Sequence, residues 1–232
     1  MPAPHLVLIP GLLCTRELYA AQVGALAHQA SITIADHRRS DTMAAIARDI
    51  LANAPERFAL AGLSMGGYIA FEILRQAPER VERLALLDTS PRPDLPEQTE
   101  NRLRLVALAE KRGVASAARE MFPKLVAPAR QNDPALSAAF LRMSEETGSE
   151  AFARQQRAIA ARADSRPLLA SIACPTLVLV GAEDALTPPP LSVEMSTAIP
   201  ASRLAVVPHA GHLSTLEEPA AVTTELRAWL GA

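Results

Sequence analysis

The residues with the clearest chemical potential form the run Gly62-Leu63-Ser64-Met65-Gly66, where a short apolar stretch passes into a longer amphipathic one. A serine between a strand and a helix occupies a tight turn, and the residues two before and two after it come too close to carry side chains. Glycines stand at both positions, whereas a helix cap needs only one polar residue. The spacing therefore predicts a strained turn that lifts the Ser64 hydroxyl clear of the backbone as a nucleophile.

A serine hydroxyl needs a general base and an orienting carboxylate to become nucleophilic. Two downstream segments supply them in the order Ser, Asp, His, because TLVLVGAEDALTP contains Asp184 and LAVVPHAGHLSTLEEP contains His212. Each residue follows a run typical of a buried strand, and the carboxyl ends of parallel strands gather at one edge of a sheet. We therefore predict that Ser64, Asp184 and His212 meet at this edge as a catalytic triad.

Other acids and histidines leave alternatives for two of these roles. Glu183 neighbours the predicted acid, and Asp88 ends its own strand in LALLDTSP, where it could instead stabilise the following turn. His209 competes with His212 as the base, but the small residue before His212 allows a closer approach to the serine. The remaining histidines lie outside the strand-end loops and are expected to be surface or core residues: His5, His28 and His37.

Hydrolysis of an acyl bond also requires N–H donors for the oxyanion that develops in the transition state. The backbone N–H of Met65 begins the helix after the serine, and that of Leu12 follows Pro10-Gly11 at the end of the first strand. We predict that these two groups form the oxyanion hole. An apolar pocket is expected beside them, with three candidates for substrate contact, although core packing is the plainer interpretation of each: Leu13, Tyr19 and Tyr68.

Parallel strands joined by helices would position these residues, and the chain alternates short apolar runs with amphipathic segments. Strands are predicted at 5–9, 31–35, 58–61, 84–88, 176–180 and 204–207. Helices are predicted at 16–28, 43–54, 65–77, 191–198 and 220–229. The expected fold class is α/β, with a mostly parallel sheet of six strands and helices on both faces.

One long stretch interrupts this alternation. From about residue 91 to residue 167, apolar residues recur at helical spacing without a convincing strand, and Pro123, Pro128 and Pro134 divide the stretch into short helices. We therefore predict a core formed by residues 1–90 and 168–232, with an inserted helical segment at 91–167.

The composition limits the classes of partner. The 23 basic and 25 acidic residues give a formal net charge of −2 and are spread without blocks, so neither nucleic acid nor a membrane is expected as a partner. No apolar run reaches transmembrane length, and the first one lacks the features of a secretory signal. Cys14 and Cys174 match no disulfide or zinc pattern, so we expect free thiols, no metal and a cytoplasmic location.

Taken together, these segments resemble the α/β-hydrolase family, which uses the same glycine-flanked serine turn. The resemblance spans essentially the whole chain and rests on PGLL, GLSMGG, PERVERLALLDTSP, IACPTLVLVGAEDALTP and GHLSTLEEP. It implies that residues 91–167 form a cap over the active site and that no cofactor is needed. Small members with this layout include carboxylesterases, 3-oxoadipate enol-lactonase, carbon-carbon bond hydrolases and cofactor-free haloperoxidases.

Two departures from the family pattern concern the first strand. Pro10 replaces the common histidine before the glycine of the oxyanion loop. Only four residues precede the strand, so the antiparallel strands that often open this fold are not expected and the sheet should be a reduced one.

The expected activity is hydrolysis of an ester, lactone or related acyl bond in a small apolar molecule through an acyl-enzyme. Two alternatives use the same residues: cleavage of a carbon-carbon bond or a lyase-like elimination, and a ligand receptor that retains the triad. The fold alone does not choose among them. Turnover of simple aryl esters would favour the esterase, whereas acylation of Ser64 without turnover would favour the receptor.

Overall fold

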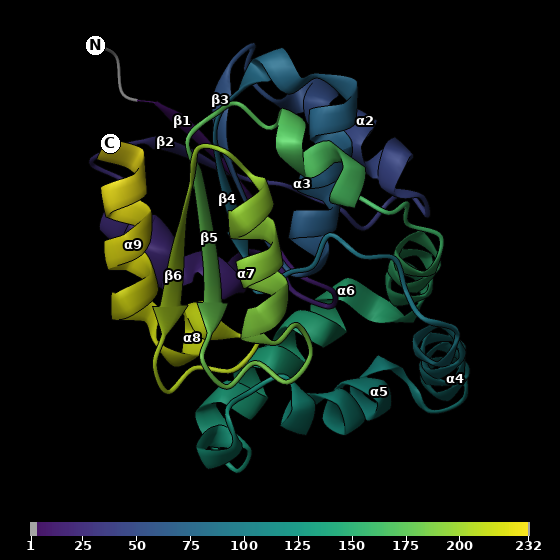
Figure 1. Ribbon diagram of the computed structural model, residues 1–232. Helices are drawn as coiled ribbons and strands as arrows, with labels where there is room; N and C mark the ends of the chain where they lie inside the picture. Colours follow the sequence, from purple (N-terminus) through teal and green to yellow (C-terminus); the bar gives the residue numbers. More distant parts are fainter. Residues whose placement is uncertain (1–3, 232) are drawn as a thin grey trace.

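Six parallel strands form the centre of the protein in the computed structural model, which describes residues 4–231 (Figure 1). The strands are β1 His5–Ile9, β2 Ser31–Ile34, β3 Phe58–Leu63, β4 Val81–Leu87, β5 Thr176–Gly181 and β6 Ser202–Val207. Their order is β2-β1-β3-β4-β5-β6, and every neighbouring pair is parallel. The predicted sheet is confirmed, with strand ends that differ from the expected ones by up to three residues.

Helices cover both faces of the sheet because alternate residues of each strand point to opposite sides. In β1, Leu6 and Leu8 pack into one core, whereas Val7 and Ile9 pack into the other. The first core is covered by α1 Ala20–Leu26 and α9 Pro219–Gly231, and the second by α2 Met43–Asn53, α3 Met65–Gln76 and α7 Pro189–Ala198. Figure 1 shows α9 and α7 on opposite sides of β5 and β6.

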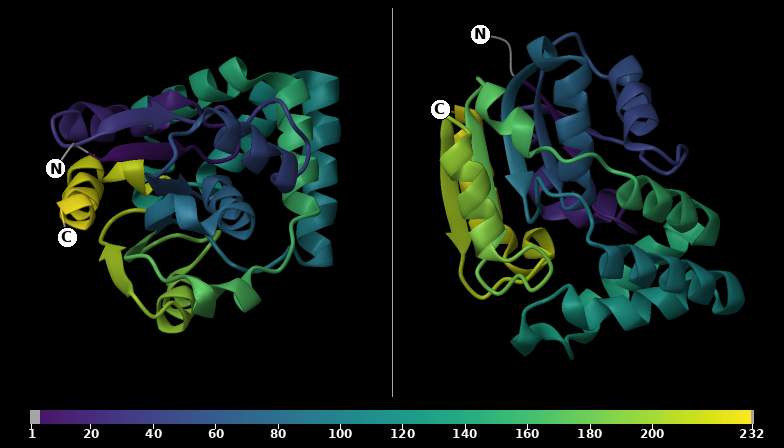
Figure 2. Two further views of the ribbon diagram at one scale, coloured as in Figure 1. Left: turned by 90° about the horizontal axis from the view of Figure 1, so that it is seen from above. Right: turned by 45° about the vertical axis from the view of Figure 1, so that its right-hand side comes forward.

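Within the described residues, the segment between β4 and β5 contains helices and no strand. Its main helices are α4 Pro96–Arg112, α5 Val114–Met121 and α6 Pro134–Ala160, and α6 is broken at Gly148, where φ is 77°. Proline stands at the start of α4 and α6, where its missing N–H costs no helical hydrogen bond. These helices form a layer beyond the carboxyl ends of the strands, at the lower right of Figure 1 and of the right-hand view in Figure 2.

The strand order reverses direction at β1, because β2 lies on one side of it and β3 on the other. The crossovers that follow β1 and β3 therefore diverge, and ligands of open α/β sheets bind in the crevice at such a point. A Cβ added to Gly11, just after β1, would lie 3.5 Å from Cβ of Ser64, just after β3. The topology thus brings the predicted oxyanion loop beside the predicted nucleophile.

Candidate active site

Ser64 occupies a strained turn between β3 and α3, with φ at 55° and ψ at −113°. A non-glycine residue in such a conformation costs about 1–3 kcal/mol and persists where its surroundings fix it. The Ser64 N–H donates to the Leu87 carbonyl at 2.9 Å, and the Thr89 hydroxyl donates to the Ser64 carbonyl at 2.8 Å. Both backbone polar groups of the serine are therefore held by the end of β4 and the residues after it.

Three glycines leave room for this turn. A Cβ on Gly62 would lie 2.3 Å from the Gly66 carbonyl, and a Cβ on Gly66 would lie 2.1 Å from a carbonyl oxygen of β1. A Cβ on Gly67 would lie 2.4 Å from Oγ1 of Thr89, the hydroxyl that holds the Ser64 carbonyl. None of the three glycines has a positive φ, so close contact and not backbone freedom requires them.

The structure brings the three predicted triad residues together at the carboxyl ends of β3, β5 and β6. Nε2 of His212 lies 2.8 Å from Oγ of Ser64, and Nδ1 of His212 lies 2.8 Å from Oδ2 of Asp184. Asp184 and His212 are buried, with 2% and 4% of their surface exposed. This geometry allows the imidazole to accept the serine proton while it donates its other N–H to the carboxylate.

Asp184 is oriented by its own loop. Its Oδ1 accepts from the N–H groups of Leu186 at 2.8 Å and Thr187 at 2.9 Å, and its Oδ2 accepts from the Thr187 hydroxyl at 2.7 Å. Thr187 is not among the predicted site residues. The signal for it is its position three residues after an aspartate in a turn, where short side chains commonly bond nearby backbone and side-chain groups.

The negative charge of Asp184 and the positive charge of protonated His212 stabilise each other. Burial lowers the pKa of His212, but the charge of Asp184 and the hydrogen bond to it outweigh burial and leave this pKa above the ordinary imidazole value. Burial raises the pKa of Asp184, but His212 and the loop hydrogen bonds outweigh burial and leave this pKa below the ordinary carboxyl value. Asp184 is therefore suited to remain ionised when His212 takes up a proton.

Asp88 bonds to neighbouring loops and not to the imidazole. It is fully buried, its Oδ1 accepts from the Gly181 N–H at 2.8 Å, and its Oδ2 accepts from the Ser214 hydroxyl. Burial and the nearby charge of Asp184 raise the pKa of Asp88. Asp88 thus connects the loops that carry Asp184 and His212. Asp184, and not Asp88, is the carboxylate that contacts the imidazole.

The other two alternatives lie on the surface. Glu183 is exposed, and His209 is exposed in a turn with φ at 61°. Among residues 4–231, no hydrogen bond joins either side chain to Ser64, Asp184 or His212.

The two predicted oxyanion donors belong to different chain segments next to Ser64. Met65 is the first residue of α3, so its N–H has no acceptor within the helix. Leu12 follows Gly11 in the loop after β1, and both residues line the cavity above the serine. These positions fit a substrate oxygen held by both N–H groups.

A buried polar network holds the loop after β1, which carries one of the two predicted oxyanion donors. Nε2 of His37 lies 3.0 Å from the Gly11 carbonyl oxygen and 3.2 Å from Nε2 of Gln155, while Oε1 of Gln155 accepts from the Leu13 N–H at 3.2 Å. Both side chains are buried, and burial lowers the pKa of His37 to about 4. His37 is thus a neutral core histidine near pH 7, and it is also part of the support for the loop that carries Leu12.

A cavity of about 490 Å³ opens above Ser64, between the edge of the sheet and the helical segment. Ser64, His212, Gly11 and Leu12 line it from the sheet side. Tyr68 also lines it, as expected for a substrate-contacting candidate. The helical segment contributes a mixed wall that includes several apolar residues: Leu95, Leu105, Met121, Leu125, Phe140 and Ile159.

Leu13 and Tyr19 do not line this cavity, so the expectation that they contact the substrate is corrected. Both are fully buried in the core. Leu13 adopts φ at 60° and directs its N–H to Gln155, whereas the Tyr19 hydroxyl donates to the Ile9 carbonyl at 3.1 Å. Core packing is therefore the correct interpretation of these two residues, and Leu12 takes the place in the cavity that was expected for Leu13.

Other groups in the described part of the chain offer no second centre of chemistry. Both cysteines are free, and burial raises the pKa of Cys14 to about 12, which keeps this thiol protonated and a poor nucleophile. Between residues 4 and 231, no cluster of His, Cys, Asp or Glu is placed to hold a metal ion. No helix in the same range is long and apolar enough to cross a membrane.

The close packing around the serine turn makes a prediction about stability. Gly66→Ala should lower the midpoint of thermal unfolding by roughly 6–12 °C, as a loss of about 3 kcal/mol would do in a chain of this size, because its Cβ would overlap a β1 carbonyl oxygen. Gly24→Ala in α1 is the matched control, since no atom lies within 4 Å of its Cβ. An unchanged midpoint for Gly66→Ala would show that the turn is not packed in this way.

Comparison with known proteins places this chain in a family. The sequence profile of the α/β-hydrolase family matches residues 6–225. An esterase from Thermogutta terrifontis, solved with malate bound, is 33% identical, with a TM-score of 0.90 over 99% of this chain and 90% of that chain. The enol-lactonase from Burkholderia xenovorans is 27% identical, with a TM-score of 0.90 over 100% of this chain and 93% of that chain. A pimeloyl-[acyl-carrier protein] methyl ester esterase from Pectobacterium carotovorum is 28% identical over 98% of this chain and 94% of its own length. The chain therefore belongs to the α/β-hydrolase family and is a hydrolase.

Proposed function

We propose that this enzyme hydrolyses a carboxylic ester or lactone of a small molecule through an acyl-enzyme on Ser64. The observation that carries the proposal is the unbroken hydrogen-bond chain from Ser64 to His212 to Asp184, with 2.8 Å at each step, beside the cavity. Esterase and enol-lactonase are also the activities named for the similar proteins above, and both reactions break an acyl–oxygen bond.

The proposed mechanism assigns one step to each group. Nε2 of His212 removes the proton from Ser64 as Oγ attacks the carbonyl carbon, and Asp184 stabilises the imidazolium. The N–H groups of Leu12 and Met65 stabilise the tetrahedral oxyanion. The intermediate then expels the alcohol oxygen, which takes the proton from His212, and water repeats the sequence to release the acid.

We further propose that residues 91–167 act as a cap over this site and that residues 1–90 and 168–232 form the core. In support, the loop that carries His212 is packed against this segment. The Leu213 N–H donates to the Leu125 carbonyl at 3.0 Å, and a Cβ on Gly211 would lie 2.4 Å from the backbone nitrogen of Ala127. The position of the base therefore depends on the position of the cap.

A buried carboxylate strengthens this junction. Glu217 accepts from the Ala127 N–H at 2.7 Å and from the Gly211 N–H at 3.0 Å, and burial raises its pKa. Glu217 is not among the predicted site residues. Its sequence signal is weak, because one of its two partners lies 90 residues away.

Two free thiols, one of them buried, suit a protein that works in a reducing compartment, and we place the enzyme in the cytoplasm on that ground. Its proposed partner is a small-molecule substrate.

Removal of the nucleophile gives the direct test of the reaction. The wild-type enzyme should hydrolyse 4-nitrophenyl esters of short acids, and Ser64→Ala should lower kcat by about 10⁵- to 10⁶-fold while the fold stays intact. Ser196→Ala on α7, outside the cavity, is the matched control and should retain activity within about threefold. Retained turnover in Ser64→Ala would refute the assignment, and a wild type that cleaves only vinylogous diketones would favour carbon-carbon chemistry.

The acidic limb of the pH profile tests the base. Only neutral His212 can accept the serine proton, so kcat/KM should fall as the pH drops through the pKa of His212. Because Asp184 raises this pKa, the midpoint of the limb should lie above about 6.5, the ordinary imidazole value.

Asp184→Asn should move the acidic limb to lower pH and reduce kcat by about 10⁴-fold. The variant loses the negative charge that raises the pKa of His212, and the imidazole is no longer held in the correct tautomer. The exposed neighbour supplies the control, because Glu183→Gln should change neither quantity. A limb that keeps its position in Asp184→Asn would show that Asp184 does not set the pKa of the base.

A further inference from the structure

The cap side of the cavity carries five cationic side chains that the proposed mechanism does not use. They are Arg92, Arg102, Lys124, Arg162 and Arg166, and all of them come from residues 91–167. Among the described residues, no Asp or Glu side chain lines this cavity.

Two of the five cations each pair with one acidic residue that does not line the cavity. Arg92 pairs with Glu194 at 2.9 Å, and Arg166 pairs with Asp164. Both arginines are about half exposed, so water screens what remains of their charge.

Asp94, in contrast, is shared by two guanidinium groups. It lies 2.6 Å from Arg102 and also contacts Arg162, and its side chain is 1% exposed. Burial raises the pKa of Asp94, but the two arginines outweigh burial and lower it below the ordinary value. Asp94 therefore supplies one negative charge for two positive charges, and the wall keeps a surplus of one positive charge where solvent screening is weak.

Arg162 is committed to the structure of the wall. It donates to the backbone carbonyls of Arg92 and Ile159, at 3.0 Å each, and its guanidinium lies 4.3 Å from the ring centroid of Tyr68. Arg102 is the more exposed of the two arginines, with 19% of its side chain exposed against 7% for Arg162. Arg102 donates through Nε and Nη2 to Asp94 and through Nη1 to Gln156, so one N–H on each of Nη1 and Nη2 remains to meet a ligand.

Gln156 adds an unused donor next to Arg102. Its Oε1 accepts from Arg102 at 2.9 Å, and the residue is buried and lines the cavity. Its Nε2 is itself shielded from solvent and has no hydrogen-bond partner within the described part of the chain, so it reaches a ligand only if the amide turns towards the cavity. A buried donor without an acceptor is costly, so such a group often marks a place where a ligand or water supplies the missing oxygen.

We propose that Arg102 and Gln156 form a subsite for a carboxylate of the substrate, with the Asp94–Arg162 pair next to Arg102. This inference rests on the proposed function and narrows the substrate class to esters or lactones that carry a free carboxylate. One carboxylate balances the one surplus charge, and the planar guanidinium suits the two oxygens of a carboxylate. The apolar residues of the cavity suit a hydrocarbon chain between the carboxylate and the reacting carbonyl.

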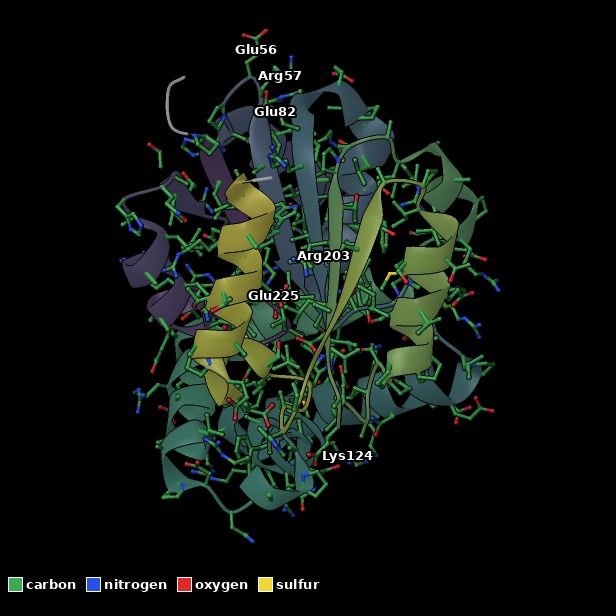
Figure 3. The ribbon with its side chains drawn as sticks, turned by 60° about the vertical axis from the view of Figure 1, so that its left-hand side comes forward. Glu56, Arg57, Glu82, Lys124, Arg203 and Glu225 are labelled. Atoms are coloured by element: carbon green, nitrogen blue, oxygen red, sulfur yellow. The ribbon has the colours of Figure 1, made fainter. Side chains whose placement is uncertain are left out.

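Lys124 supports the same preference from farther away. It is exposed, and Glu120, on which its charge acts, is already bonded to Arg104. Figure 3 shows Lys124 at the end of the molecule that the cap occupies, whereas Arg57 lies at the opposite end of the sheet. Lys124 therefore adds to the attraction of an anionic substrate towards the cavity.

The test uses pairs of esters that differ only in charge: the monomethyl and dimethyl esters of succinic, adipic and suberic acids. The wild type should show a kcat/KM at least roughly tenfold higher for the monomethyl member of one or more pairs. In Arg102→Gln this ratio should fall to about one. The variant should fold, because Asp94 keeps Arg162 as a balanced partner.

Two further variants sharpen the kinetic test. Arg102→Lys keeps the positive charge and should retain part of the preference. Arg57→Gln removes the cation of the exposed Arg57–Glu82 pair far from the cavity and should retain all of it. A preference that is absent from the wild type, or that survives in Arg102→Gln, would overturn the subsite.

Calorimetry on Ser64→Ala separates the subsite from the reaction, since binding requires no turnover. For at least one pair the monoester should bind roughly tenfold more tightly than the diester, and Arg102→Gln in the same background should remove the difference. Equal affinities of monoester and diester in every pair would overturn the subsite even if the wild type hydrolyses esters. Preferential binding of a monoester without any hydrolysis by the wild type would support the subsite and overturn the proposed reaction.

Discussion

The contact between the start of α3 and the end of β1 is the constraint on which the site depends. Because a Cβ on Gly66 would lie 2.1 Å from a β1 carbonyl oxygen, the helix approaches the strand at backbone distance. This approach, with the hydrogen bond that Ser64 donates to the Leu87 carbonyl and the one that it accepts from the Thr89 hydroxyl, holds Ser64 at φ 55°. The same contact sets the distance between Ser64 and the Gly11–Leu12 loop. The proposed nucleophile and one proposed oxyanion donor thus share this packing interaction.

The second set of constraints ties the loops that carry Asp184 and His212 to one another and to the proposed cap. Asp88 connects Gly181 with Ser214, and Glu217 connects Gly211 with Ala127. Both carboxyl groups are buried and have raised pKa values, whereas Asp184 has a lowered one. Three acids near one imidazole therefore differ in role because their surroundings differ. Asp184 faces His212, and the other two mainly hold backbone and hydroxyl donors in place.

Much of this arrangement could be predicted because its signals are local. Uniformly apolar runs mark the buried strands, and glycines two residues either side of Ser64 mark the turn. The rule that parallel strand ends share one edge then brings Ser64 to Asp184 and His212.

The direction of side chains in the loop after β1 could not be predicted in the same way. Leu13 turns into the core at φ 60°, so a residue next to the oxyanion loop in sequence does not reach the cavity. Gln155 supports that loop from 142 residues away, and Asp94 sits between two arginines only after residues 91–167 fold.

The central claim is that His212 activates Ser64, and covalent labelling tests it most directly. The folded wild type would be treated with a fluorophosphonate, and the adduct would be located by intact mass and peptide mapping. We expect a single adduct on Ser64, and little labelling of a folded His212→Ala variant over the same time, because the serine then lacks its base. A folded wild type that remains unlabelled, or a His212→Ala variant that labels equally fast, would contradict the claim.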